Sequence, residues 1–209
     1  MELQRPFATV TPTLDGDVLA VLAADNIAFT TGQIHRILNR FSEEGIRKVL
    51  ARLVLQGIVT ADRVGNAFAY RLNRDHLAAE PILALAGIPR AFLSKLEHEL
   101  ERWEYQPKYA AVFGSALRGT MTVRSDIDLF LVRSHGTPPA EWTRDVNELS
   151  ASVTRWTGND ARIVEYTITE LRKAVAEPMV GEVLDNGLTI AGSRAWLLKL
   201  VRPTSTKRD

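Results

Sequence analysis

Two aspartates stand one residue apart in the strand-forming segment DIDLFLV, which begins at Asp126. Successive side chains of a strand alternate between faces, so Asp126 and Asp128 share one face at a spacing of about 7 Å. Two unpaired carboxylates in such positions raise each other's pKa and cost stability. A divalent cation removes that cost, because Mg²⁺ prefers oxygen ligands and is often held by one or two carboxylates plus substrate phosphates. The pattern therefore predicts a Mg²⁺ or Mn²⁺ site that works with a phosphorylated substrate.

The residues before the aspartates suit phosphate binding. The apolar strand YAAVF ends at Gly114 and Ser115, and Gly114 has no side chain to block a phosphate. Ser115 can cap the next helix or donate its hydroxyl to an anion, and free N–H groups at a helix start attract anions. Arg118 and Arg124 are close enough in sequence to neutralise a polyphosphate. The alternative interpretation is an ordinary strand-to-helix turn followed by a strand that starts with aspartate.

This arrangement resembles the DNA polymerase β-like nucleotidyltransferase superfamily, in which Gly-Ser precedes Asp-x-Asp on the next strand. Here Gly114-Ser115 is followed by the ten residues ALRGTMTVRS and then by Asp126-Ile127-Asp128. The additional Gly119 and Ser125 resemble the minimal-type members. The resemblance extends over residues 90 to 195.

The resemblance implies a nucleotidyltransferase that uses Mg²⁺ or Mn²⁺ and takes ATP or another NTP. The simplest reaction is transfer of AMP to an acceptor hydroxyl on a protein, an RNA or a small molecule. It also implies roles for individual residues: metal binding by Asp126 and Asp128, and nucleotide binding by Gly114, Ser115, Arg118 and Ser125.

Members of this superfamily usually add a third carboxylate from a neighbouring strand. The segment GNDARIVEYTITEL offers Glu165 within an apolar strand and Asp160 just before it. We prefer Glu165 as a catalytic and metal-binding residue, because a charge inside a strand needs a partner. Asp160 and the absence of any functional third carboxylate remain alternatives. Neither residue has the usual Val-Asp-Leu setting, which leaves two other functions open: a regulator that senses nucleotide without catalysis, and a toxin–antitoxin-type interaction protein.

The first third of the chain predicts three helices and a hairpin. Apolar residues at helical spacing follow Ser42, namely Ile46, Val49, Leu50 and Leu53, and define one buried helix face. Gly57 should end this helix, and two short strands should follow around Gly65. The pattern resembles the recognition helix and wing of winged-helix transcription regulators.

That resemblance implies binding to duplex DNA, for which basic side chains on the third helix and the wing are candidates. The candidate DNA-binding residues are Ser42, Arg47, Lys48, Arg52 and Arg63. Glu43 and Glu44 suit the start of a helix but would repel phosphates. A winged helix that mediates dimerisation or protein contact is the alternative, and a homodimer is compatible with either.

The composition restricts the remaining possibilities. The net charge of +1 excludes a polycation, so any DNA contact must come from a local patch. The chain has no cysteine, which excludes disulfides and thiolate metal sites. No apolar stretch approaches the ~20 residues that span a bilayer, so we expect a cytoplasmic protein without membrane contact.

The expected fold is therefore α+β, with a small mixed sheet in its second part. We expect four segments: residues 1–78 as a winged helix-turn-helix DNA-binding domain, residues 79–106 as a connector and linking helix, residues 107–200 as a nucleotidyltransferase-like domain, and residues 201–209 as a mobile tail.

Overall fold

The computed structural model describes residues 1–201. All but the first residue of the predicted C-terminal tail, 201–209, lies outside the described residues. The backbone contacts divide the chain into two compact units, Glu2–Arg90 and the segment from Ala91 onwards, which Met1 joins. This division places the first part of the expected connector with the N-terminal unit. Each unit is described separately below.

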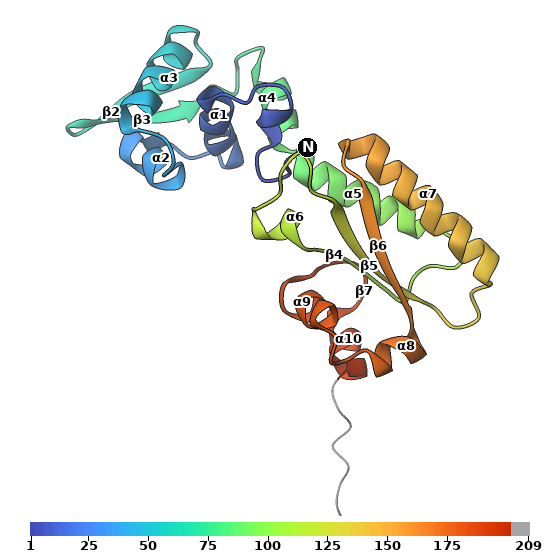
Figure 1. Ribbon diagram of the computed structural model, residues 1–209. Coiled ribbons are helices and arrows are strands. Elements are labelled where there is room, and N and C mark those ends of the chain that lie inside the picture. Colours follow the sequence, from blue (N-terminus) through green and yellow to red (C-terminus); the bar gives the residue numbers. More distant parts are fainter. Residues whose placement is uncertain (202–209) are drawn as a thin grey trace, which may run out of the picture. The chain divides into compact units, whose positions relative to one another are not determined.

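The N-terminal unit alternates short helices with a small antiparallel sheet (Figure 1). The strand order of this sheet is β1-β3-β2, and β2 and β3 form a hairpin whose turn contains Gly65 at a φ of 60°. The elements in chain order are η1 (Pro6–Thr9), α1 (Leu14–Ala24), β1 (Phe29–Thr30), α2 (Thr31–Ile37), α3 (Glu43–Leu55), β2 (Val59–Val64), β3 (Ala67–Leu72) and α4 (Ala79–Ala86).

Local sequence signals set the ends of the helices α2 and α3. Thr30 and Gln33 form a capping box at the start of α2, where Thr30 N donates to Gln33 Oε1 at 2.7 Å. Ser42 caps α3 by accepting from Gly45 N at 3.1 Å. Gly57 follows the end of α3 with a φ of 75°, a conformation that glycine adopts without steric cost.

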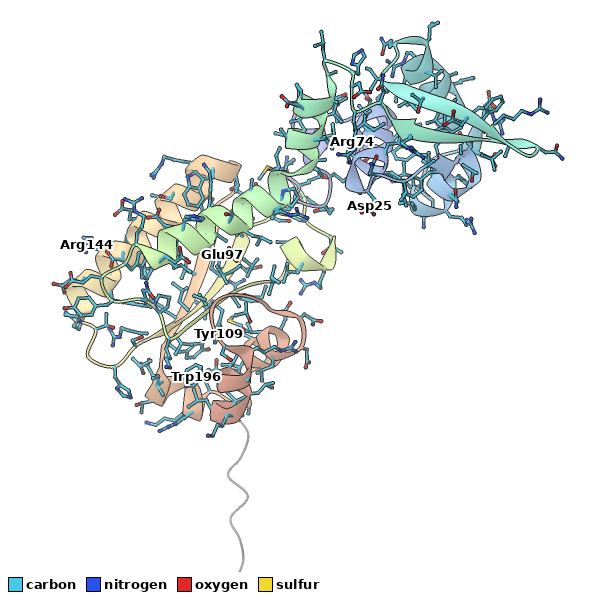
Figure 2. The ribbon with its side chains drawn as sticks, turned by 180° about the vertical axis from the view of Figure 1, so that it is seen from behind. Asp25, Arg74, Glu97, Tyr109, Arg144 and Trp196 are labelled. Atoms are coloured by element: carbon cyan, nitrogen blue, oxygen red, sulfur yellow. The ribbon has the colours of Figure 1, made fainter. Side chains whose placement is uncertain are left out.

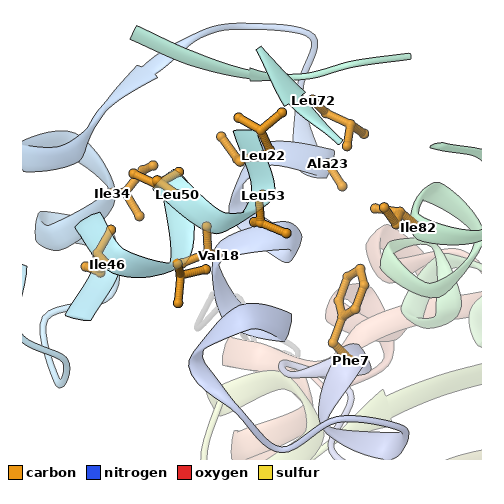
Figure 3. Packing of buried hydrophobic residues seen from close by; sticks show 12 residues of the cluster. Phe7, Val18, Leu22, Ala23, Ile34, Ile46, Leu50, Leu53, Leu72 and Ile82 are labelled. Carbon is orange, nitrogen blue, oxygen red and sulfur yellow. The ribbon is translucent and has the colours of Figure 1, made fainter. Parts of the chain in front are cut away.

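The core of the N-terminal unit is apolar and contains the predicted face of α3 (Figure 3). Leu22 of α1, Ile34 of α2 and Leu50 of α3 are fully buried in it. Ile82 of α4 belongs to the same core. This is why a segment that the sequence predicted to be part of a connector instead forms a packed helix.

The C-terminal unit is a mixed sheet covered by helices on both faces. Its strand order is β6-β5-β4-β7, with β5 and β6 parallel and the other neighbours antiparallel. The elements of its described part are α5 (Ile88–Glu101, whose first residues precede Ala91), β4 (Tyr109–Phe113), α6 (Ser115–Arg118), β5 (Ile127–Arg133), α7 (Pro139–Thr157), β6 (Ala161–Thr167), α8 (Ile168–Lys173), α9 (Pro178–Asn186), β7 (Leu188–Gly192) and α10 (Arg194–Val201).

The two faces of this sheet bury different side chains. Helices α5 and α7 lie on one side of the sheet, and α8, α9 and α10 lie on the other (Figure 1). Tyr109 and Phe130 pack with Leu171 and Val183 on the α8–α10 side. Glu97 and Arg144 are exposed on α5 and α7, whereas Tyr109 is fully buried (Figure 2). Strands β4 and β5 are therefore buried on both faces, and polar residues concentrate at their ends.

The observed architecture confirms the prediction of an α+β chain with small sheets, the second of them mixed. Helix α10 was not predicted from the sequence, although its Leu197 is fully buried. Among the described residues, no helix combines the length and the apolar character that crossing a membrane requires.

Candidate active site

The candidate site is built around the turn between β4 and α6. Gly114 has a φ of 76° and a ψ of −149°, a region that is essentially restricted to glycine. A Cβ atom at this position would lie only 2.1 Å from Asp128 Oδ2. Phe113 pairs with Asp128 across the antiparallel β4–β5 ladder. The Gly-Ser turn is thus packed directly against the second aspartate.

The start of α6 leaves backbone donors available beside this turn. Leu117 N and Arg118 N make the first helical hydrogen bonds, to Gly114 O at 3.2 and 3.3 Å. No side chain caps the helix start. The N–H groups of Ser115 and Ala116 precede these bonds, which is the arrangement that accepts an anion at the end of a strand-to-helix turn.

Asp126 and Asp128 lie where β5 begins, and the structure brings Asp128 to the Gly-Ser turn, with Asp126 close enough for its charge to act on Asp128. Asp126 is exposed and directly precedes the strand, whereas the Asp128 side chain retains only 17% of its exposure. Burial raises the pKa of the Asp128 carboxyl above its ordinary value, with Arg162 opposing the shift and Asp126 and Glu182 adding to it. A nearby cation stabilises the ionised form of such a buried carboxylate.

Two arginines provide positive charge around the aspartates. Arg162 pairs with Asp128 in the parallel β5–β6 register, so the two side chains share a face, and Arg162 Nη1 lies 3.9 Å from Asp128 Oδ1. Arg118, a predicted nucleotide-binding residue, forms an ion pair with Glu182 of α9. Neither Arg162 nor Glu182 was predicted as a site residue, because neither belongs to the Gly-Ser or Asp-x-Asp segment.

Glu165 lies away from the aspartates, which corrects its predicted catalytic and metal-binding role. In the parallel register, Asp128 is opposite Arg162 and Leu131 is opposite Glu165. Because side chains alternate along a strand, Glu165 shares the face of Leu131, opposite to that of Asp128. Its carboxylate accepts a hydrogen bond from Trp142 Nε1 of α7. The charge inside the strand therefore has a structural partner.

Asp160 does not replace Glu165 as a third ligand. Asp160 is exposed, and its carbonyl oxygen accepts from Ile127 N at 2.8 Å where the β5–β6 pairing begins. Within residues 1–201, no group of three histidine, cysteine, aspartate or glutamate side chains is arranged to hold a metal ion. The site therefore offers a pair of carboxylates, which suits one hard divalent cation whose remaining ligands are substrate oxygens.

A comparison with protein families identifies this part of the chain. Residues 93–175 match the family model of the nucleotidyltransferase domain. The chain contains a nucleotidyltransferase domain. The prediction of a nucleotidyltransferase is thereby confirmed, and the matched segment includes the Gly-Ser turn and both aspartates.

Solved structures resemble part of the chain at low identity. A toxin–antitoxin with AMP-PNP is 20% identical, with 52% of this chain and 80% of that chain covered and a TM-score of 0.39. The toxin–antitoxin MntA–HepT is 18% identical, covering 54% of this chain and 80% of that one at a TM-score of 0.36. A tri-AMPylated Shewanella oneidensis HEPN toxin in complex with MNT antitoxin is 14% identical, covering 54% and 82% at a TM-score of 0.36. No curated protein matches the chain.

A buried asparagine fixes the loop that leads to Asp126 in the nucleotidyltransferase domain. Asn159 is 3% exposed, and its Nδ2 donates to Ser125 O at 2.8 Å, with Val123 O at 3.4 Å and Thr122 O at 3.5 Å. The Ser125 hydroxyl accepts from Thr122 N at 2.9 Å, and its role in nucleotide binding stays a prediction. Ser125 thus has a structural role within the loop, and Asn159 is a positioning residue that the sequence did not reveal.

We expect Asn159→Ala to destabilise the nucleotidyltransferase domain and to lower nucleotidyl transfer. The substitution leaves loop carbonyls without their buried donor, which should cost about 1–3 kcal/mol in the free energy of unfolding. Urea unfolding measures this loss, and amide hydrogen exchange of residues 122–126 should accelerate. The control is Asn147→Ala on the exposed side of α7, where alanine favours the helix. Equal stability and exchange in the two variants would contradict the positioning role.

The basic side chains predicted to bind DNA lie in the N-terminal unit and are engaged in local contacts. Arg47 pairs with Glu43 at 2.9 Å and with Glu44 at 3.0 Å, and Lys48 lies 3.7 Å from Glu44. Arg52 pairs with Asp15 of α1.

Two further candidates have structural partners as well. Ser42 is the cap of α3, and Arg63 Nε donates to Gly65 O at 3.3 Å in the hairpin. All three basic residues of α3 are about half exposed or more, but each must exchange an intramolecular ion pair before it can bind a phosphate.

Proposed function

We propose that the nucleotidyltransferase domain transfers AMP from ATP to an acceptor hydroxyl with one Mg²⁺ or Mn²⁺ ion. The observation that carries the proposal is the contact between the Gly114 backbone and the Asp128 carboxylate, since no Cβ would fit between them. This contact joins a phosphate-type turn to the carboxylate pair. Asp126 and Asp128 would hold the ion, which would neutralise phosphate charge.

In this reaction the acceptor oxygen forms a bond to the α-phosphorus of ATP. The bond from that phosphorus to the oxygen bridging to the β-phosphate breaks, pyrophosphate leaves, and the hydroxyl proton passes to water. The N–H groups of Ser115 and Ala116 would donate to phosphate oxygens and orient the chain of phosphates. A solvent acceptor for the proton is consistent with the lack, within residues 1–201, of a third carboxylate that joins the aspartates as a metal ligand.

The experiment is incubation of the protein with each α-labelled NTP, Mg²⁺ and fractionated cell lysate. Labelled product should depend on ATP and Mg²⁺ and should disappear in the Asp126→Asn/Asp128→Asn double variant. Separate protein, RNA and small-molecule fractions identify the class of acceptor. Binding of Mg²⁺–ATP without a labelled product in any fraction would instead support a regulator that senses nucleotide. The observation that favours this second function is that an arginine, Arg162, lies opposite Asp128 on β6 where a third carboxylate would be expected.

We further propose that the N-terminal unit is a winged helix that binds duplex DNA through α3 and the β2–β3 hairpin. The order of its helices and strands and the exposed basic residues on α3 support this proposal. The ion pairs with Glu43 and Glu44 weaken the positive field of α3, so the affinity for DNA phosphates would depend on exchanging them.

We expect Arg47→Ala/Lys48→Ala to weaken duplex binding and to flatten its salt dependence. Each lost phosphate contact lowers the log–log slope by about 0.9. Glu44→Gln should have the opposite effect, because Glu44 pairs with both Arg47 and Lys48. Fluorescence anisotropy with duplexes over a series of salt concentrations measures both changes. The control is Lys173→Ala in the other unit, and equal binding by all these variants would rule out α3 as the DNA-binding helix.

A further inference from the structure

The side chain of Arg162 occupies the face of the sheet where a third carboxylate of a two-metal site would be expected. Its Cα is the direct register partner of Asp128 on the adjacent parallel strand. Register partners in a parallel pair point to the same side of a sheet. Arg162 is therefore the nearest side chain to Asp128 on β6, and its charge is opposite to that of a metal ligand.

The guanidinium of Arg162 is only loosely held. Its side chain is 59% exposed, and its Nη1 lies 3.9 Å from Asp128 Oδ1, well beyond the ~2.7–2.9 Å of a charge-assisted hydrogen bond. No other ion pair or hydrogen bond engages the side chain within the described residues. An arginine carries five N–H donors, so most of its capacity is available beside the carboxylate pair.

The other arginine at the site is committed to a protein partner. Arg118 forms an ion pair with Glu182, and the exposed fractions of the two side chains are 51% and 30%. The surroundings of Asp128 are otherwise acidic, since the charges of Asp126 and Glu182 both help to raise the pKa of its carboxyl. A triphosphate that approaches these carboxylates needs positive charge from the protein, and Arg162 is the cation placed to supply it.

We propose that Arg162 binds the phosphates of the nucleotide and serves as a second cation, supplied by the protein, beside a single metal ion. A guanidinium matches two phosphate oxygens at once and remains protonated throughout the reaction. It forms no covalent bond and moves no proton. Its contact with Asp128 would be exchanged for phosphate contacts when the nucleotide binds. This inference rests on the proposed nucleotidyl transfer and specifies which residue recognises the substrate.

The test compares ATP affinity of the wild-type protein with that of Arg162→Ala, Arg162→Lys and Arg172→Ala. Calorimetric titration with ATP is performed once in EDTA and once in Mg²⁺, so that metal-independent binding is measured directly. Arg172 is an exposed arginine near the end of α8 and serves as the charge-matched control. Labelled transfer is measured in parallel.

We expect Arg162→Ala to weaken ATP binding about 10- to 100-fold in both buffers, the range of a lost hydrogen bond between charged groups. The ATP affinity of Arg162→Lys should lie between those of the wild type and Arg162→Ala, because lysine keeps the positive charge but cannot donate two parallel hydrogen bonds as a guanidinium does. Arg172→Ala should bind as the wild type does.

ATP affinity that is unchanged in Arg162→Ala would overturn this inference while leaving the proposed transfer intact. A wild-type protein that binds no ATP in either buffer would overturn both proposals. If Arg162→Ala weakened ATP binding only in the Mg²⁺ buffer, this would also count against Arg162 as a direct phosphate ligand, since the guanidinium contact needs no metal.

Discussion

Asp126→Asn and Asp128→Asn are each expected to reduce nucleotidyl transfer by at least about 10²–10³-fold, the loss typical for a group that stabilises transition-state charge. Both changes keep the size of the side chain and remove the negative charge that a divalent cation requires. The measurement is labelled transfer at saturating Mg²⁺, together with circular dichroism to verify the fold. Glu165→Gln is the matched control, because Glu165 lies on the opposite face of the sheet and contacts Trp142.

The same variants should separate a functional role from a structural one through stability. Burial raises the pKa of Asp128 in the folded protein, so its ionised form costs stability at pH values above that raised pKa. The cost disappears as the pH falls below the ordinary aspartate pKa of about 3.9. In metal-free buffer, Asp128→Asn should therefore unfold at higher temperature than the wild type at pH 7, and this difference should shrink in acid. Full transfer by Asp128→Asn, or a loss equal to that of Glu165→Gln, would refute the assignment.

Gly114→Ala is expected to reduce transfer strongly and to destabilise the nucleotidyltransferase domain. The backbone at Gly114 lies in a region where alanine costs about 1–3 kcal/mol. Its Cβ would in addition meet the Asp128 carboxylate at 2.1 Å, so either the turn or Asp128 must move. Because transition-state stabilisation depends on the placement of such groups, we expect a loss of transfer comparable to that of Asp128→Asn.

Gly119→Ala is the control for backbone strain without a collision. Gly119 ends α6 with a φ of 70°, and a Cβ there would have no neighbour within 4 Å. The substitution Gly119→Ala should lower the free energy of unfolding by about 1–2 kcal/mol and keep measurable transfer. Urea unfolding and transfer assays on both variants distinguish the two effects. If Gly114→Ala retained transfer at the level of Gly119→Ala, close packing of the turn against Asp128 would not be needed for function.

Local patterns in the sequence were sufficient to single out the carboxylate pair and to predict a nucleotidyltransferase; the role of the pair in metal binding stays a prediction. The alternation of DIDLFLV placed Asp126 and Asp128 on one face, and the Gly-Ser step before them indicated a turn suited to phosphate. The buried face of α3 and the cap at Ser42 followed from helical spacing and from hydrogen bonds between close neighbours. Such features depend on residues within a few positions of one another, which is why they can be read without the fold.

Only the tertiary structure determined which side chains lie beside Asp126 and Asp128. Glu165 and Arg162 are on the same strand, and a shift in register by one residue would exchange the faces that they present to β5. The observed register sends Glu165 to Trp142 and Arg162 to Asp128. Asn159 and Glu182 reach the site from a loop and a helix that are distant in sequence from both motifs. Strand register and long-range packing depend on the whole core, so no local pattern could specify them.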